Sequence, residues 1–236
     1  MLKRIICCLI LAGPPGLSGI YAQTNFAFDG KDAVMVFDVN GKPFENQNSN
    51  VVGTPFLRDD WRLGAVTIAT NRRYDSVKLR FNLQTQEFHY LNKDSVEIAL
   101  FKGYIKDVLF YDGIPGMTGA NAEFQAGFPA IDEQDGNSFY LVLCKGKISL
   151  LKCMRKVLSR GDNLFNGGEV KREYISHEDY YSWDGKVMQK IKKDKSAVLS
   201  LLADQQAKVS DFITSNHFKL KSVDEVRRVI DYYNSL

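Results

Sequence analysis

The chain has 236 residues, of which 44% are hydrophobic and 25% are charged. This composition is typical of a folded globular protein and excludes intrinsic disorder, collagen-like repeats and low complexity. The 31 basic and 28 acidic side chains give a formal net charge of only +3, whereas nucleic-acid binding needs a clustered basic excess, so we expect no nucleic-acid partner.

Residues 1–22 have the pattern of a cleavable signal peptide. Lys3 and Arg4 form a short positive region, an apolar run follows over residues 5–11, and Ala22 is the small residue before the cut. The apolar run is too short to span the roughly 30 Å of hydrocarbon in a bilayer, so an uncleaved anchor is the less favoured alternative. We predict export to the periplasm, the cell envelope or the extracellular space, with no transmembrane segment.

Residues 23–192 are predicted to form a β-rich domain. Apolar and polar residues alternate over 76–83 and again over 95–100, which indicates strands with one buried and one solvated face. Short turns, such as those at 92–93 and 102–103, separate eight to ten strands in this interpretation. The predicted fold class is α+β, with a predominantly antiparallel β meander that forms a curled sheet, a half-barrel, a barrel or a sandwich.

Residues 193–236 are predicted to form three short C-terminal helices, packed on or beside the sheet. Apolar residues recur at helical spacing in each of them, and Ser222 forms a capping box with Glu225 before the last one. Asp204 is expected to cap the second helix. Because each helix has an apolar stripe, each needs a partner surface that buries it.

Two cysteines remain after removal of the signal peptide, Cys144 and Cys153. An oxidising compartment permits a disulfide. The two residues flank a turn at 145–147, and in a hairpin closed by that turn they would not lie opposite each other, as a disulfide requires. We therefore expect two free, buried thiols rather than a Cys144–Cys153 disulfide.

Known catalytic motifs are missing from the sequence. The chain contains no phosphate-binding glycine loop, no dinucleotide fingerprint and no serine nucleophile elbow. Its three histidines lack metal-ligand spacing, so no metal and no cofactor are expected. His177, followed by Glu178 and Asp179, is the local acid–histidine cluster that can take part in acid–base chemistry. The alternative is a polar strand end, because consecutive strand residues point to opposite faces.

The segment Asp59-Asp60-Trp61-Arg62 is the most interesting candidate for a ligand site. A tryptophan beside paired carboxylates can act as a ligand platform, because indole offers a broad apolar face and one donor. The alternative is a loop whose tryptophan packs at the entry to the next strand. An acidic run at 132–137 can similarly suggest calcium, but it lacks the pattern of a calcium loop, and a surface turn is favoured.

Several segments of the chain resemble a family of small exported proteins of the Bacteroidota. The segments are Gly53–Leu57, Asp59–Trp61, Leu79–Asn82, Gly127–Asp132 and the ending Tyr232-Tyr233-Asn234-Ser235-Leu236. The resemblance implies a Gram-negative export route and a β-rich body followed by a helical tail. The family has no assigned activity, so the resemblance identifies no catalytic residue.

These features favour an exported, non-enzymatic protein of the cell envelope that binds a small amphipathic ligand or an envelope protein. One alternative is a structural or interaction module that docks a partner through the C-terminal helices. Another is a hydrolase with an unrecognised site, built on His177 or on the Asp59–Asp60 pair. An open apolar cup in the sheet would favour ligand binding, and a core filled by its own side chains would count against a carrier.

Overall fold

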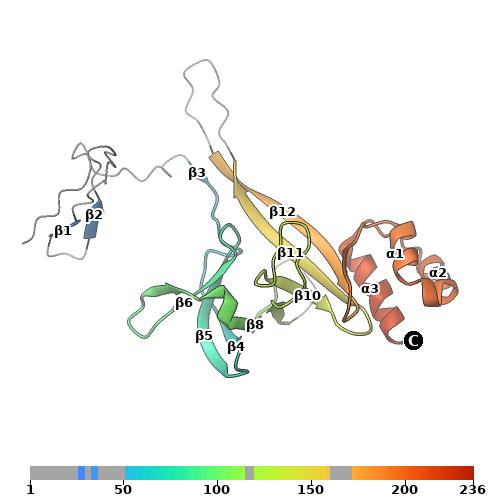
Figure 1. Ribbon diagram of the computed structural model, residues 1–236. Coiled ribbons are helices and arrows are strands. Elements are labelled where there is room, and N and C mark those ends of the chain that lie inside the picture. Colours follow the sequence, from blue (N-terminus) through green and yellow to red (C-terminus); the bar gives the residue numbers. More distant parts are fainter. Residues whose placement is uncertain (1–25, 30–32, 37–50, 115–119, 160–171) are drawn as a thin grey trace, which may run out of the picture. The chain divides into compact units, whose positions relative to one another are not determined.

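The computed structural model describes residues 26–29, 33–36, 51–114, 120–159 and 172–236. The predicted signal peptide lies outside the described residues. The chain divides into two compact units, 1–49 and 50–236. The first contains an antiparallel hairpin of β1 (Phe26–Asp29) and β2 (Ala33–Val36), and the second contains the other described elements (Figure 1).

Eleven strands of the second unit form a mixed sheet that is not closed. Ten of them follow one path, in the order β13 (Met188–Lys190), β12 (Arg172–Trp183), β11 (Ser149–Leu158), β10 (Tyr140–Cys144), β9 (Ala122–Gln125), β8 (Ile105–Phe110), β4 (Arg62–Ile68), β5 (Arg73–Asn82), β6 (Glu87–Leu91) and β7 (Glu97–Ala99). Neighbours on this path pair antiparallel. The eleventh strand, β3 (Val51–Val52), pairs in parallel with the start of β12. The structure confirms the α+β class and excludes the closed barrel.

The strand order departs from a simple meander at one place. Strands β4 to β7 form one meander and β8 to β13 form a second. Between them the chain passes through the 3-10 helix η1 (Lys102–Tyr104) and returns past β6 and β5, so that β8 pairs with β4. The prediction of a hairpin turn at 102–103 was therefore wrong, because β7 and β8 do not pair with each other. Alternation reveals which residues share a face but not which strands become neighbours.

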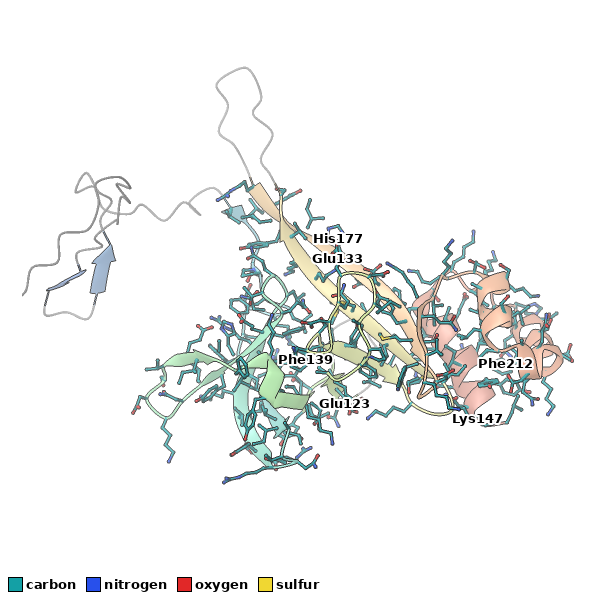
Figure 2. The ribbon with its side chains drawn as sticks, viewed as in Figure 1. Glu123, Glu133, Phe139, Lys147, His177 and Phe212 are labelled. Carbon is teal, nitrogen blue, oxygen red and sulfur yellow. The ribbon has the colours of Figure 1, made fainter. Side chains whose placement is uncertain are left out.

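Phenylalanine side chains fill the inner face of the sheet. Phe81 and Phe88 stack with their ring centroids 4.2 Å apart. The ring of Phe88 contacts that of Phe139 edge-on, with the centroids 4.9 Å apart (Figure 2). Phe81, Phe88, Phe124 and Phe139 are almost completely buried, and Phe110 lies in the same cluster. A ligand cannot occupy this part of the interior without displacing the rings.

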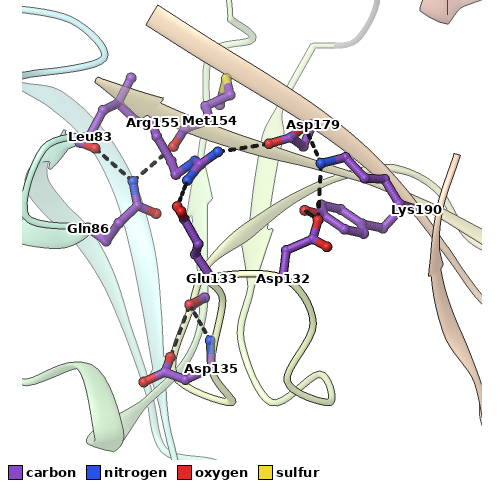
Figure 3. Close-up of polar contacts among 11 residues, drawn as sticks. Leu83, Gln86, Asp132, Glu133, Asp135, Met154, Arg155, Asp179 and Lys190 are labelled. Carbon is purple, nitrogen blue, oxygen red and sulfur yellow. Dashed lines mark hydrogen bonds and ion pairs between the residues drawn. The ribbon is translucent and has the colours of Figure 1, made fainter. Parts of the chain in front are cut away.

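The sheet curls far enough to bring the turn between β5 and β6 against β11. Gln86 in this turn donates hydrogen bonds from Nε2 to the carbonyl oxygens of Leu83 and Met154, at 2.9 and 2.8 Å (Figure 3). The backbone N–H of Lys156 also donates to the carbonyl of Leu83 at 3.1 Å. These contacts link the two meanders at a second place, away from the β4–β8 pair.

The three helices α1 (Lys195–Leu201), α2 (Gln206–Ser215) and α3 (Val223–Asn234) lie beside β10 and β11 (Figure 1). Their apolar stripes form a second core cluster with residues such as Ile148 and Leu150. Ser222 caps α3 as predicted, because its hydroxyl accepts a hydrogen bond from the N–H of Glu225. The cap predicted at Asp204 was wrong: Asp204 lies in the 3-10 helix η2 (Ala203–Gln205) and accepts a hydrogen bond from the hydroxyl of Tyr233.

One side chain fastens the last helix to the turn between β10 and β11. Asn234 accepts a hydrogen bond from the backbone N–H of Ile148 at 3.0 Å and donates one to its carbonyl oxygen at 2.8 Å. The amide thus pairs with the backbone as a neighbouring strand would. A Cβ atom on Gly146 would lie 2.3 Å from the Asn234 side chain, so this close approach depends on glycine.

Candidate functional site

An open apolar pocket of about 360 Å³ lies where the phenylalanine-filled core meets solvent. Its walls come from β4, β5, β6, β8 and the connection through η1, and they consist of Val66, Ile68, Tyr74, Val77, Tyr90, Leu100, Phe101, Tyr104 and Ile105. All of these side chains are aliphatic or aromatic. Six of them belong to the phenylalanine cluster or pack against it, so the pocket continues the core outward. Its volume lies within the roughly 300–1,000 Å³ of ligand sites.

Strand alternation and register explain why Val77 and Tyr90 point into the pocket. Val77 lies on the same face of β5 as the core residue Leu79, because alternate strand residues share a face. Tyr90 is directly opposite Leu79 in the β5–β6 ladder and therefore points to that face too. At the mouth, the N–H of Ala69 donates to the carbonyl of Tyr104 at 2.9 Å, which fixes the η1 connection beside the β4–β5 turn.

Three aromatic side chains at the mouth are exposed to solvent. Phe101 is 79% exposed, Tyr104 is 47% exposed and Tyr74 is 41% exposed. Burial of a phenylalanine side chain is worth roughly 1.5–3 kcal/mol relative to exposure, so folding alone gives no reason for Phe101 to stand in water. Large exposed apolar patches often mark places where another molecule binds, and these three side chains all line the same pocket.

Charged groups occupy the β5 side of this mouth. The guanidinium of Arg72 lies 4.9 Å from the centroid of the Tyr74 ring. Next to it, Arg73 forms an ion pair with Asp75 at 2.9 Å, and Asp75 accepts a second hydrogen bond from the hydroxyl of Tyr111. The hydrogen bonds from Tyr111 and Arg73 lower the pKa of the Asp75 carboxyl, so this carboxylate is charged and paired.

The predicted platform at 59–62 is part of a surface charge network. Asp60 lies between Arg58 and Arg62, at 3.3 and 2.7 Å, and Asp112 contacts the same two arginines at 3.5 and 2.9 Å. Desolvation raises the pKa of Asp60, but the charges of Arg62 and Arg58 outweigh it, and the pKa is lowered. The four side chains therefore satisfy one another's charges.

The Trp61 ring is in contact with an arginine of the same protein. The Arg80 guanidinium lies 4.5 Å from the centroid of Trp61 and 3.8 Å from that of Phe56. Arg80 forms a double ion pair with Glu97, and Glu97 is hydrogen-bonded to Nδ1 of His89. The sequence does not reveal this group, because its members lie far apart along the chain and meet only through the fold, where Arg80 and His89 are direct cross-strand neighbours.

Asp59 and His177 are both exposed and lie on different elements. Asp59 precedes β4, whereas His177 lies on β12 opposite Arg155 (Figure 2). The structure therefore does not bring His177 into the charge network of Arg58 and Asp60. Its sequence neighbours also face cations, because Glu178 forms an ion pair with Lys152 at 2.6 Å.

The acidic turn at 132–137 belongs to a network of ion pairs centred on Asp179 (Figure 3). Its members are Asp132, Glu133, Arg155, Asp179, Tyr181 and Lys190. Arg155 and Lys190 contact Asp179 at 3.0 and 2.8 Å, and Lys190 also contacts Asp132 at 3.0 Å. Within the described ranges, no group of three or more His, Cys, Asp or Glu side chains is placed to hold a metal ion.

Cys144 and Cys153 are free thiols on β10 and β11. Cys153 is buried as expected, but the expectation was wrong for Cys144, which is only half-buried at the end of β10. In the ladders of the sheet, Cys144 is opposite Leu150 and Cys153 is opposite Asp179. Burial raises the pKa of Cys153 to about 11 and that of Cys144 to about 12. Both remain protonated at neutral pH, and a protonated thiol is a poor nucleophile.

No family model, no curated protein and no solved structure matches the chain. Among the helices that the structure describes, none is both long and apolar enough to cross a membrane. The apolar pocket includes none of the side chains singled out in the sequence. In a sequence, aliphatic and aromatic residues at alternating positions indicate buried core. The sequence signal for exposure at the pocket is the position of Phe101 directly before the turn-forming residues 102–103.

Proposed function

We propose that the protein is an exported, non-enzymatic binding protein of the cell envelope whose site is the apolar pocket around Phe101. The observation that carries the proposal is the lining itself: nine aliphatic or aromatic side chains, continuous with the core and open to solvent. Binding sites for small ligands are typically concave and mostly apolar. The signal-like pattern of residues 1–22 and the resemblance to exported Bacteroidota proteins support the location.

The ligand in this proposal is a small amphipathic molecule that enters the pocket from its open end. Because the phenylalanine rings fill the interior, the apolar part of the ligand is buried only in the pocket, and its polar part stays in water. This differs from a carrier that encloses its cargo inside a barrel. The open pocket favours reversible binding of one end of the ligand, with Phe101 and Tyr104 packing against its apolar part.

Titration of the purified protein with an apolar fluorescent probe tests the proposal, together with native mass spectrometry for ligands that co-purify. We expect saturable binding of one probe per chain and at least fivefold weaker binding in Phe101→Ser. Val187→Ser is the matched control, because Val187 is 57% exposed in the loop between β12 and β13 and does not line the pocket. No saturable binding, or equal binding by both variants and the wild type, would refute the proposal.

A second candidate function is a protein-interaction module, and the outer half of the β11–β12 ribbon favours it. Val157 and Ile175 are direct cross-strand neighbours, and they are 51% and 44% exposed. The C-terminal helices are less suited to docking, because their apolar stripes form their own core cluster with the sheet. A Val157→Lys variant that loses a partner while keeping probe binding would support the module.

A further inference from the structure

We infer that the pocket around Phe101 takes the hydrocarbon tail of a single-chain anionic amphiphile, and that Arg72 is the specificity-determining residue for its anionic head. The inference rests on the proposed function and deepens it by naming the ligand class. It follows from three features of the site: the chemistry of the walls, the position of one guanidinium and the balance of charge around the mouth.

The walls determine the part of the ligand that is buried. Of the nine lining side chains, six offer only carbon and hydrogen, and Tyr74, Tyr90 and Tyr104 add one hydroxyl each. A polar or charged group inserted among them would lose its hydration without gaining enough hydrogen bonds, which is unfavourable. A hydrocarbon chain loses no hydrogen bonds on entry and gains the transfer of apolar surface out of water. The buried part is therefore a hydrocarbon chain.

Arg72 determines the sign of charge that is favoured at the mouth. Its guanidinium lies 4.9 Å from the Tyr74 centroid, and Tyr74 is itself part of the pocket wall. A guanidinium above a ring uses its face for the contact and keeps N–H groups in its plane available for a carboxylate, which it can bind in a bidentate manner. Arg72 is exposed, and its guanidinium is a cation with N–H donors only.

The cation nearest the pocket wall is Arg72, and the other charged groups lie around the β4–β5 turn. Arg73 and Asp75 form an ion pair and compensate each other. Lys106 follows the wall residue Ile105, and its Nζ donates to the side-chain oxygen of Asn71 at 2.7 Å, which is a neutral partner. Arg72 and Lys106 place two positive charges beside the β4–β5 turn, Asp107 follows Lys106 on β8, and the lining contributes no carboxylate next to the Arg72 guanidinium. An anionic head is attracted to this place and a cationic head is repelled.

Calorimetric titration with three amphiphiles of equal tail length tests the inference: dodecanoate and dodecyltrimethylammonium below their critical micelle concentrations, and dodecanol below its solubility limit. The wild-type protein should bind dodecanoate most tightly and the cationic amphiphile most weakly. Arg72→Ala should weaken dodecanoate binding by about three- to tenfold, the range for one exposed charged hydrogen-bonding partner, and should leave dodecanol binding unchanged. Arg72→Lys should retain part of the preference, because lysine keeps the charge but lacks the planar fork.

Arg228→Ala is the matched control, because Arg228 stacks on Phe218 in the helical region at 4.8 Å, in the same way as Arg72 stacks on Tyr74. It should leave the affinity for all three amphiphiles unchanged. Equal affinities for dodecanoate and dodecanol that Arg72→Ala does not alter would overturn the inference and leave the proposed function standing. Equal weakening of both ligands by Arg72→Ala would assign Arg72 a packing role, which also overturns it. No binding of any of the three, and none of an apolar probe, would refute the proposed function itself.

Discussion

Replacing Asn234 with alanine should destabilise the protein by detaching α3 from the sheet. The side chain makes two hydrogen bonds with the backbone of Ile148, at 2.8 and 3.0 Å, in a half-buried position. Each hydrogen bond is worth about 0.5–1.5 kcal/mol, and the substitution also leaves a backbone donor and an acceptor without their partner. We expect the free energy of unfolding to fall by about 2–3 kcal/mol. For a chain of this size, this corresponds to a melting temperature roughly 4–12 °C lower.

Urea denaturation followed by circular dichroism measures this change. The matched control is Asn216→Ala at the end of α2, where the side chain makes one exposed hydrogen bond to the carbonyl of Phe212. We expect the control to lose less than about 1 kcal/mol. If Asn234→Ala lost no more than the control, the amide would contribute no attachment, and α3 would be held by its apolar contacts alone.

Three further perturbations test other contacts. Gly146→Ala should lower the free energy of unfolding by about 1–3 kcal/mol, because its new Cβ would lie 2.3 Å from the Asn234 side chain. Chemical denaturation should show a smaller loss when Asn234 is also replaced by alanine, and an equal loss would contradict the clash. The hydrogen bond from Lys190 lowers the pKa of Asp179 from its ordinary 3.8, so the stability it adds is present above pH 3.8 and lost as pH falls through the lowered value. Lys190→Met should therefore unfold with a weaker pH dependence in that acidic window, and an unchanged acid titration of stability would argue against the pair. Cys144 and Cys153 should resist a thiol reagent at pH 8 in the native state and react on unfolding, because desolvation raises their pKa values to about 12 and 11. Rapid native labelling of both, measured by mass spectrometry, would contradict the raised pKa values.

The sequence predicts element types well, because these depend on local periodicity. The buried face expected for the segment 95–100 was wrong, since Ile98 in the edge strand β7 and Val96 directly before it are exposed. The alternating segment 76–83 lies largely in β5, and the capping pattern at Ser222 marks the start of α3. The pairing of β4 with β8 cannot be predicted in this way, because nothing in the sequence of either strand indicates which strand lies next to it. The same holds for β3, whose two residues pair with β12 after a separation of more than a hundred positions.

The candidate site was harder to predict than the fold. Trp61 and its acidic neighbours have the composition of a binding platform, but Arg80, on a different strand, lies against the indole ring. Conversely, Phe101 and Tyr104 resemble ordinary core residues in the sequence, and the structure leaves them at an open mouth. Whether an apolar residue is buried depends on what packs over it, and composition does not contain that information.

The crossover after β7 has a consequence for the order of assembly. Gly64 pairs with Phe110, so the chain must close a long loop before β8 can join β4, and such non-local contacts form slowly. Leu100 and Tyr104 lie in the connection that this step puts in place. During synthesis the hairpins from β4 to β7 emerge without a complete pocket, and an amphiphile that met the nascent chain would find only half of its walls. If the pocket binds a ligand as proposed, capture requires that β8 has already docked on β4, because β8 supplies the wall residue Ile105.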